Sequence, residues 1–484
     1  MKNKDLTIDA TLPTENISKE GSKMFLAMIC FVASLGGILF GFDTAVISGT
    51  FGMVETQFGL SKLEVGWFGS SALIGAIIGA LIAGTLSDRY GRKPILTLSA
   101  FLFFISALGS TIPPTFFLLI PARLIGGIGV GMASVLSPLY ISEFAPPKIR
   151  GRLVALYQLS IVLGILLAYF SNWWLLHYAQ GNAVLSENTG WLHKIMVTEV
   201  WRGMFGAEMV PSGLFLILLF FVPESPRWLI KAGQDQKGYA TLSRVSGAAF
   251  AKVEFGAIKH AIKQEEGTLK ELLAPGLKLA LIVGLGLSVF GQFSGVNIVI
   301  YYGPTILENA GYPLDSALQF QVAIGLINLI FTLIAIYKID SWGRRPLLIG
   351  GMTAVFISLL IIAIQFTIGL ASGIWIVVML CIYIGSLALS INAVIWVLLG
   401  EIYPNRVRGR AMSIATFANW TTNFVTVFLF PLFVAQVGMN AAFFVFAGFC
   451  LIATLFFYRY VPETKGKSLE EIEQYWHEKG SALQ

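Results

Sequence analysis

Charged residues are scarce in this chain. Of its 484 residues, 12% are Asp, Glu, Lys or Arg, 56% are apolar, and the mean hydropathy is +0.75. A soluble protein of this length would divide into several cores and carry about twice this fraction of charge. The composition therefore excludes an ordinary soluble globular protein and predicts a polytopic membrane protein.

Cysteine is rare as well, and the usual signatures of enzymes are missing. Cys30, Cys381 and Cys450 lie inside apolar runs, which favours core packing over a disulfide framework or a zinc site. The run GGIGVG at 126–131 lies in an apolar stretch with no preceding strand, so it is a poor dinucleotide fingerprint. Without a nucleophile–base pair, a metal cluster or a Walker sequence, we expect no enzyme, no cofactor and no direct use of ATP.

The net charge of +6 is not gathered into one basic patch, which argues against a nucleic-acid partner. Loops at 87–94, 142–152, 338–346 and 401–410 hold three Lys or Arg each, whereas the alternate loops hold almost none. This asymmetry predicts that both termini are cytoplasmic. Residues 1–23 are polar and lack the apolar core of a signal peptide, so we expect them to form a cytoplasmic tail.

Short charged phrases occur twice in the chain, at the ends of long apolar stretches. SDRYGRKP (Ser87 to Pro94) recurs as DSWGRRP (Asp340 to Pro346), SEFAPPKIRGR recurs as GEIYPNRVRGR, and PESPR is answered by PETKG. The repeats describe one long unit that has been duplicated and fused. A duplicated membrane unit can pivot against its copy around a central site, which is how secondary transporters work.

A hydrocarbon core of about 30 Å requires roughly 20 apolar residues per helix, and unpaired backbone groups are excluded from lipid. The expected helical spans are 24–48, 63–86, 95–112, 116–141, 150–176, 200–222, 279–308, 315–338, 346–369, 374–399, 410–436 and 440–460. The expected domains are a tail at 1–23, a six-helix bundle at 24–222, a cytoplasmic helical linker at 223–278, a second six-helix bundle at 279–461 and a tail at 462–484. We therefore predict an all-α membrane protein with twelve transmembrane helices in two pseudo-symmetric bundles.

The repeated charged loops carry acids and bases at matched positions. The residues in question are Asp88, Arg89, Arg92, Glu143, Arg152, Glu224, Asp340, Arg344, Glu401 and Arg410. If these residues only determined the membrane topology, with side chains that extend to the lipid headgroups, the basic residues would be explained but the acidic residues at matched positions would not. We interpret the set as cytoplasmic ion pairs that hold the outward-open state and break as the bundles rock.

Few ionisable residues lie inside the expected spans, where each is costly unless it is paired or functional. Asp43 lies in the first span, Arg123 in the fourth and Glu208 in the sixth. If Asp43 faces Arg123, the pair could act as a protonation switch or as a static buried salt bridge. For Glu208 the sequence is equally consistent with a structural hydrogen bond and with a role in proton coupling.

Polar side chains also collect in two of the spans. Gln158 lies in the fifth span, and the seventh contains GQFSGVNIVIYYGP, whose Gly residues and terminal Pro predict a broken helix lining a cavity. Amides bond hydroxyls as donors and as acceptors, and aromatic rings cover C–H faces, so this combination suits a sugar. Taken singly, each amide could instead join helices.

Four motifs carry a resemblance to a known family: GRKP with GRRP, PESPRWL, QFSGVNIVIYY and VPETKGKSLEEIE. Over residues 24–475 the chain resembles the sugar porters of the major facilitator superfamily, and it is most similar there to the bacterial D-xylose–proton symporters. The resemblance implies a multi-pass protein of the plasma (inner) membrane that takes a monosaccharide and a proton as its partners. We expect it to function as a monomer.

The resemblance also implies roles for individual residues. Sugar contacts are expected from Gln158, Gln292, Asn297, Asn328, Trp396 and Asn419, with Phe40, Tyr301 and Tyr302 near the cavity. Asp43 corresponds to the proton-linked carboxylate of symporters, where facilitative relatives carry an amide, and Arg123 is its expected partner. The chain departs from the family pattern at Gly291, Ile165, Asn392-Ala393 and Asn419, so the identity of the sugar stays open.

Three functions are consistent with these observations. The first is a proton-coupled importer of a pentose or hexose, working by alternating access. The second is a facilitative uniporter, in which Asp43 only braces Arg123. The third is a sugar receptor that does not transport. Such receptors often carry a long extra tail, whereas only about 20 residues follow Val461 here.

Overall fold

The computed structural model describes residues 21–146, 149–182, 190–262, 269–371, 373–467 and 469–481. Eleven helical segments in this part of the chain are long and apolar enough to cross a membrane. The last one, Arg406–Tyr460, contains two of the expected spans, because Gly438 adopts φ 87° and ψ 165°, far from helical values. Residue Gly438 thus divides α19 into two helices, so the segments account for the twelve expected passes.

The first half of the chain forms the N-terminal bundle. Its spans are α1 (Lys23–Val46), α3 (Lys62–Tyr90), α4 (Arg92–Thr111), α5 (Phe116–Phe144), α6 (Arg150–Asn182), and the pair α8 (Val200–Gly206) and α9 (Met209–Leu219). Short helices connect them: η1 (Ile47–Gly49), α2 (Phe51–Phe58), α7 (Trp191–His193) and the single π-helical turn η3 (Lys194–Thr198).

The second half forms the C-terminal bundle. Its spans are α13 (Pro275–Phe293) with α14 (Val296–Asn309), α15 (Leu314–Trp342), α16 (Arg344–Thr367), α17 (Ile374–Leu389) with α18 (Ile391–Glu401), and α19 (Asn405–Tyr460). Between the bundles lie α10 (Pro226–Lys231), α11 (Asp235–Ser246), α12 (Ala248–Ile262) and η4 (Leu269–Leu273), and α20 (Leu469–Ser481) follows α19.

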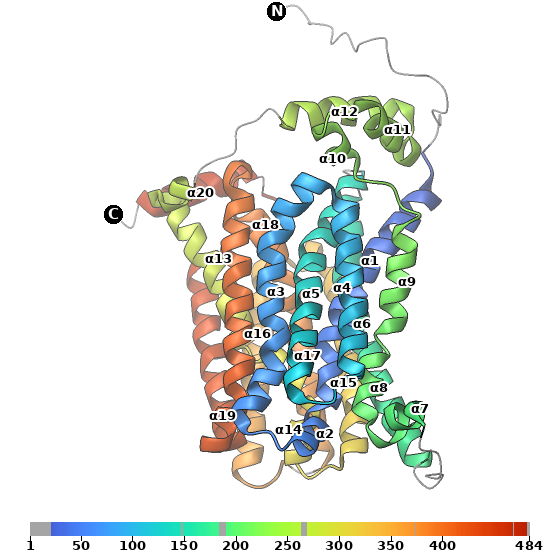
Figure 1. Cartoon of the computed structure of the whole chain (residues 1–484). Helices are drawn as coiled ribbons and strands as arrows, with labels where there is room; N and C mark the ends of the chain where they lie inside the picture. Colours follow the sequence, from blue (N-terminus) through green and yellow to red (C-terminus); the bar gives the residue numbers. More distant parts are fainter. Residues whose placement is uncertain are drawn as a thin grey trace, which may run out of the picture.

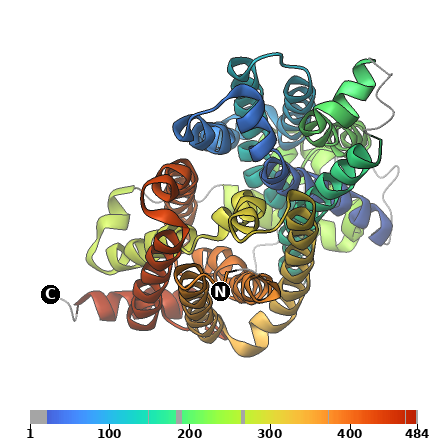
Figure 2. The ribbon, with the colours of Figure 1, turned by 90° about the horizontal axis from the view of Figure 1, so that it is seen from below.

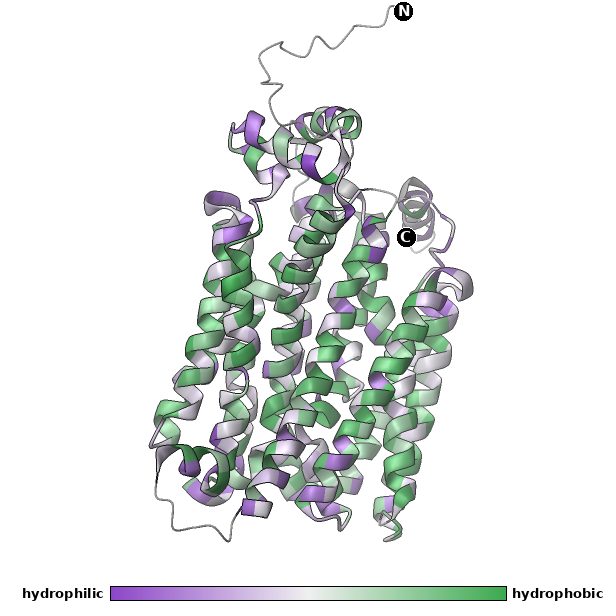
Figure 3. Ribbon diagram, turned by 90° about the vertical axis from the view of Figure 1, so that its right-hand side faces the viewer, coloured by the Kyte–Doolittle hydropathy of each residue, from purple (hydrophilic) through white to green (hydrophobic). Residues whose placement is uncertain are grey.

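The two bundles stand side by side, as the view along the helices shows (Figure 2). Hydrophobic residues dominate the middle of the helices, and hydrophilic residues gather toward both ends (Figure 3). Helices α10–α12 and α20 lie at one end, which we call the linker face, and α2 and α7 lie at the other, the opposite face (Figure 1). A bundle of this kind satisfies its backbone groups internally and presents apolar side chains to lipid.

Three spans are interrupted near their middles. The predicted break in the seventh span is confirmed at Gly295, where φ is 81°, a left-handed value that favours glycine. The break at Ser390, with φ −106° and ψ −106°, and the break between α8 and α9 at Ala207–Glu208 were not expected. Interrupted helices free backbone groups and re-aim side chains, so each break is a candidate site position.

The bundles meet through residues nearer the opposite face. The rings of Phe51 and Tyr302 stack with centroids 4.4 Å apart, and the rings of Trp67 and Phe428 meet edge to face at 6.3 Å. A Cβ built on Gly66 of α3 would lie 2.3 Å from the backbone oxygen of Phe428 in α19. The close approach of the two bundles here therefore requires a glycine, and the opposite face is closed.

Gly66→Ala should open this contact. Neither backbone can relax cheaply around a 2.3 Å clash, so we expect the closed population to fall about tenfold, for a cost of roughly 1–3 kcal/mol. Spin labels at Thr56 and Asn309, which are exposed and lie one in each bundle, should report a longer distance. Gly84→Ala is the matched control, because a Cβ there meets nothing within 4 Å. An unchanged distance distribution in Gly66→Ala would contradict the assigned contact.

Candidate transport site

A buried ion pair joins α1 to α5. Nη1 of Arg123 donates to Oδ1 of Asp43 at 2.6 Å, and Nη2 donates to the backbone oxygen of Asp43 at 3.3 Å. Both residues are 1% exposed. The guanidinium also lies over the ring of Phe205, 5.1 Å from its centroid. Desolvation of two charges at this depth is costly, so the pair is poor evidence for stability and is a candidate functional element.

Glu208 lies at the break between α8 and α9 and shares the electrostatic environment of the pair. Its side chain is 1% exposed and interacts electrostatically with both Asp43 and Arg123. Its Oε1 atom has no hydrogen-bond partner among the residues that the structure describes. Two carboxyls thus face one guanidinium in a low dielectric. The site is electrically balanced when one carboxyl carries a proton.

Small side chains allow this approach of three helices. A Cβ on Gly126 of α5 would lie 2.3 Å from Oγ of Ser106 and 3.5 Å from Oδ1 of Asp43. A Cβ on Gly127 would lie 1.9 Å from the backbone oxygen of Ala72 in α3. Glycines in the GGIGVG run therefore pack helices together, as membrane helices commonly do.

The C-terminal bundle reaches the ion pair through Tyr301 of α14. This side chain is 2% exposed, hydrogen-bonds with the Thr44 side chain and interacts electrostatically with Asp43 and Arg123. Thr44 itself donates to the backbone oxygen of Phe40 at 2.7 Å. Asp43 thus lies beside a contact between the two halves of the chain.

Three amides form a chain at the break in the seventh span. Nδ2 of Asn297 donates to Oε1 of Gln292 at 2.6 Å, and Nε2 of Gln292 donates to Oδ1 of Asn419 at 2.9 Å. The left-handed turn at Gly295 separates Gln292 and Asn297, which come from different helices, and allows their side chains to meet. Amides that bond one another can exchange these bonds for sugar hydroxyls without being left unpaired.

An aromatic pair joins the two bundles, and one of its members was not anticipated. The rings of Phe40 and Trp420 are 5.6 Å apart and join α1 to α19. Trp420 follows Asn419 directly and is 6% exposed, and Asn423, three residues later, is 4% exposed with no partner for Oδ1 in the described chain. The polar run AxxANWTTN within an apolar span was the available signal, and only Asn419 was predicted from it.

The other expected sugar contacts are not hydrogen-bonded to the amide chain. The hydroxyl of Tyr302 donates to the backbone oxygen of Val427 at 3.1 Å, so Tyr302 belongs to the contact that closes the opposite face. Gln158 is half-buried, Asn328 is buried and Trp396 is 39% exposed. Within the described residues, no hydrogen bond joins Gln158, Asn328 or Trp396 to the three amides.

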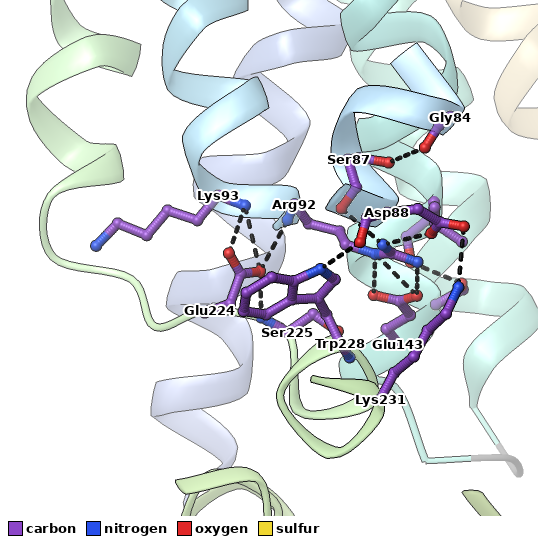
Figure 4. Close-up of polar contacts among 12 residues, drawn as sticks. Gly84, Ser87, Asp88, Arg92, Lys93, Glu143, Glu224, Ser225, Trp228 and Lys231 are labelled. Atoms are coloured by element: carbon purple, nitrogen blue, oxygen red, sulfur yellow. Dashed lines mark hydrogen bonds and ion pairs between the residues drawn. The ribbon is translucent and has the colours of Figure 1, made fainter. Parts of the chain in front are cut away.

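On the linker face of the N-terminal bundle, Arg92 joins α3, α4 and α5. Its guanidinium bonds Asp88 at 2.8 Å and Glu143 at 3.2 Å, and Lys231 of α10 reaches Asp88 at 3.0 Å (Figure 4). Arg92 also donates to the backbone oxygen of Ser87, in the last turn of α3. The three spans are therefore fastened together at this end.

The duplicated unit repeats this cluster in the C-terminal bundle. Arg344 pairs with Asp340 at 3.0 Å and with Glu401 at 2.9 Å, and Thr464 donates to the second oxygen of Glu401 at 2.6 Å. Each cluster lies within one bundle in this conformation. A role in holding the outward-open state stays a prediction.

Glu224 and its copy Glu463 make backbone contacts and no ion pair among the described residues. Glu224 accepts from the backbone N–H groups of Arg92, Lys93 and Ser225, and Figure 4 shows its carboxylate aimed at the start of α4. Burial raises the pKa of the Glu224 carboxyl, and the backbone donors oppose that rise. Within the described residues, no ion pair includes Arg89, Arg152 or Arg410. The guanidinium of Arg89 lies over the ring of Tyr90.

The family of the chain follows from its similarity to known proteins. The model of the family "Sugar (and other) transporter" matches residues 29–476. The chain belongs to this sugar transporter family. A relative from Bacillus subtilis, the arabinose-proton symporter, is 39% identical over 98% of this chain and 100% of its own length. The D-xylose-proton symporter of Escherichia coli is 38% identical over 93% of this chain and 96% of its own length.

Solved structures of the Escherichia coli xylose transporter XylE share the fold. The inward-open conformation gives a TM-score of 0.80 at 37% identity, covering 93% of this chain and all of that one. The form bound to 6-bromo-6-deoxy-D-glucose gives 0.75 at 37% identity, covering 94% and 99%. The expected family and the major facilitator fold, a transporter and not an enzyme, are thereby confirmed.

The departures of this family member from the usual pattern leave specific features in the structure. Gly291 precedes Gln292, and a Cβ there would make ordinary contacts with Ile391 and Ile395, so the position leaves room beside α18. Ile165 is buried against α1, where a Cβ on Gly41 would touch its backbone nitrogen. Asn392 lies two residues after the Ser390 break, so α18 begins without a proline.

Proposed function

We propose that this sugar transporter imports a monosaccharide, a pentose or a hexose, together with a proton by alternating access. The observation that carries the proposal is the buried pair of Asp43 and Arg123, with Glu208 beside it and Tyr301 of the other bundle in reach. The arabinose and xylose relatives are named as proton symporters, which supports the same reading.

Proton transfer would change how Arg123 is held. With Asp43 charged, the guanidinium is fixed between α1 and α5 by two bonds. A proton on Asp43 removes the charge attraction and frees Arg123 to turn toward Glu208, whose Oε1 has no partner among the described residues. Helix α1 is then free to move against α5, and Tyr301 carries that movement to α14.

The sugar would occupy the amide chain. Gln292, Asn297 and Asn419 offer donors and acceptors to hydroxyls, and Phe40 with Trp420 offers ring faces to the C–H surface. We extend the binding surface to Gln158 of the other bundle and to Asn328 and Trp396 of the same bundle, as the resemblance to the sugar porters implies. Binding between α1 and α19 joins the halves on either side of the sugar.

We further propose that the linker face is cytoplasmic and that the protein works as a monomer in the plasma membrane. The basic loops of α3–α4 and α15–α16 lie on this face, in agreement with the charge asymmetry of the loops. The Arg92 and Arg344 clusters would approach each other there when the opposite face opens.

A protonophore tests the coupling. In vesicles with an inwardly directed proton gradient, a labelled pentose or hexose should accumulate above the outside concentration, and the protonophore should return it to equilibrium. The energy available is about 1.4 kcal/mol per tenfold gradient, enough for a tenfold accumulation per pH unit. Equilibration at the same rate with and without the gradient would instead indicate a uniporter.

A further inference from the structure

A basic pocket lies on the linker face of the C-terminal bundle, away from the transport site. It has a volume of about 230 Å³ and lies where α16, α19 and α20 come together. Four cationic side chains line it, together with Tyr475 and one carboxylate. The cations are Arg345, Arg459, Lys467 and Lys479.

Within the described residues, no carboxylate forms an ion pair with the four cations of the pocket. The carboxylate is Glu463, and its oxygens accept from the backbone N–H groups of Arg344, Arg345 and Lys465 at 2.9–3.1 Å. The negative charge is thus directed at the start of α16, and the Nε atom of Arg345 is buried without a partner.

The position of α20, which carries Tyr475 and Lys479, is fixed. Trp476 of α20 is fully buried and donates from Nε1 to the backbone oxygen of Ile402 at 2.9 Å. This anchor places Tyr475 between Lys467 and Lys479, whose amino groups lie 5.7 and 5.1 Å from its ring centroid. Arg345 and Lys479 are half-buried, whereas Arg459 and Lys467 are exposed, so the pocket opens to the surface.

An exposed apolar stripe on α19 runs directly to the pocket. Ile452 is 53% exposed, Leu455 61% and Tyr458 65%, and these positions repeat at the spacing of one helix face. Arg459 and the pocket follow at the end of that stripe, at the level where the helices end. Apolar chains against the stripe would place a headgroup among the four cations.

The duplicated half provides an internal comparison. In the register of the PES and PET motifs, Arg459 corresponds to Phe220 and Lys467 corresponds to Trp228. The corresponding pocket beside Glu224 is lined by two cations, Lys93 and Lys237, whereas the pocket of the second unit is lined by four. The concentration of positive charge is therefore a property of the second unit and not of the repeated fold.

We propose that this pocket binds the phosphate headgroup of an anionic phospholipid whose acyl chains lie along Ile452, Leu455 and Tyr458. Four convergent cations match a phosphate, and the adjoining stripe matches the hydrocarbon of the same molecule. The lipid ties α20 to the ends of α16 and α19. The proposal is independent of the sugar and of proton coupling.

Native mass spectrometry of the purified full chain tests it, with phosphatidylglycerol and phosphatidylcholine of identical acyl chains as probes. We expect phosphatidylglycerol to bind tighter than phosphatidylcholine. The double variant Arg459→Gln with Lys467→Gln should weaken phosphatidylglycerol about twentyfold, since each cation near an anionic headgroup contributes roughly fivefold. The charge-matched control, Lys237→Gln with Lys465→Gln, changes the same face outside the pocket and should leave the affinity unchanged.

A conservative variant and two further outcomes test the lipid site. Arg459→Lys should keep most of the affinity, which separates loss of charge from loss of folding. Equal retention of phosphatidylglycerol by the pocket variant and the control would overturn the site. If millimolar inorganic phosphate displaces the lipid and the acyl chains add nothing to the affinity, the pocket binds free anions and the lipid assignment is overturned.

Discussion

Asp43→Asn should abolish accumulation of sugar against a gradient while leaving exchange of labelled for unlabelled sugar in place. The amide can still hydrogen-bond Arg123, so the contact between α1 and α5 survives, but the site can no longer gain and lose a proton. We expect the accumulation ratio to fall to about 1, from roughly 10 at a gradient of one pH unit. Uptake in energised vesicles and counterflow in unenergised ones provide the two measurements.

Glu308→Gln is the matched control for this variant. Glu308 is also a carboxyl on a membrane helix of this protein, but it lies at the end of α14 near the opposite face, among exposed residues. Its neutralisation should leave accumulation and exchange unchanged. Full accumulation by Asp43→Asn, or loss of exchange together with accumulation, would show that Asp43 does not carry the coupling proton.

Gln292→Ala should have the second largest effect, on sugar affinity. Gln292 is the middle member of the amide chain, so its removal deletes contacts to the sugar and leaves Asn297 and Asn419 without their partner. Loss of two hydrogen bonds at roughly 1–1.5 kcal/mol each corresponds to about a hundredfold weaker affinity. Quenching of tryptophan fluorescence by added sugar measures it, because Trp420 follows Asn419 in the chain and its ring contacts Phe40 of the other bundle.

Gln365→Ala provides the comparison. Gln365 is on α16 of the same bundle and takes no part in the amide chain, so its variant should bind sugar like the wild type. A similar loss of affinity in both variants would point to a general effect on the bundle. An unchanged affinity in Gln292→Ala would mean that the sugar binds elsewhere.

Much of the fold could be predicted from the sequence because hydrophobic length and repeated loops are strong signals. Twelve spans follow from apolar runs of the length that a bilayer requires, and the duplicated loops give the two bundles. Gly295 and its amide neighbours also signalled the break in the seventh span. The break at Ser390 gave no such signal, since no glycine or proline stands at the interruption. Gly206 precedes the break at Ala207–Glu208, but a single glycine in an apolar span more often serves helix packing.

The site was predicted in its chemistry and less well in its contacts. Asp43 and Arg123 were expected to meet because an isolated charge in a span needs a partner, and the structure places them together. Tyr302 was expected near the cavity, and that role stays a prediction; in this conformation its ring stacks on Phe51 in the contact that closes the opposite face. Trp420 was missed, because a tryptophan in an apolar span is ordinarily read as packing.

The repeated loops show the limit of pattern reading most clearly. Matched acids and bases predicted ion pairs, and Arg92 and Arg344 form them with the expected acids. Glu224 was expected to join that set, but it accepts from backbone N–H groups at the start of α4. A sequence shows which charges are present, whereas the choice between a guanidinium and a helix end depends on how the loop turns.

The most direct measurement is proton movement driven by sugar alone. Purified protein in liposomes that enclose a pH-sensitive dye is given a pentose or hexose outside, with no initial pH difference. The account predicts acidification of the lumen in step with sugar entry, and none with Asp43→Asn. Sugar entry by the wild type without any change of luminal pH would contradict it.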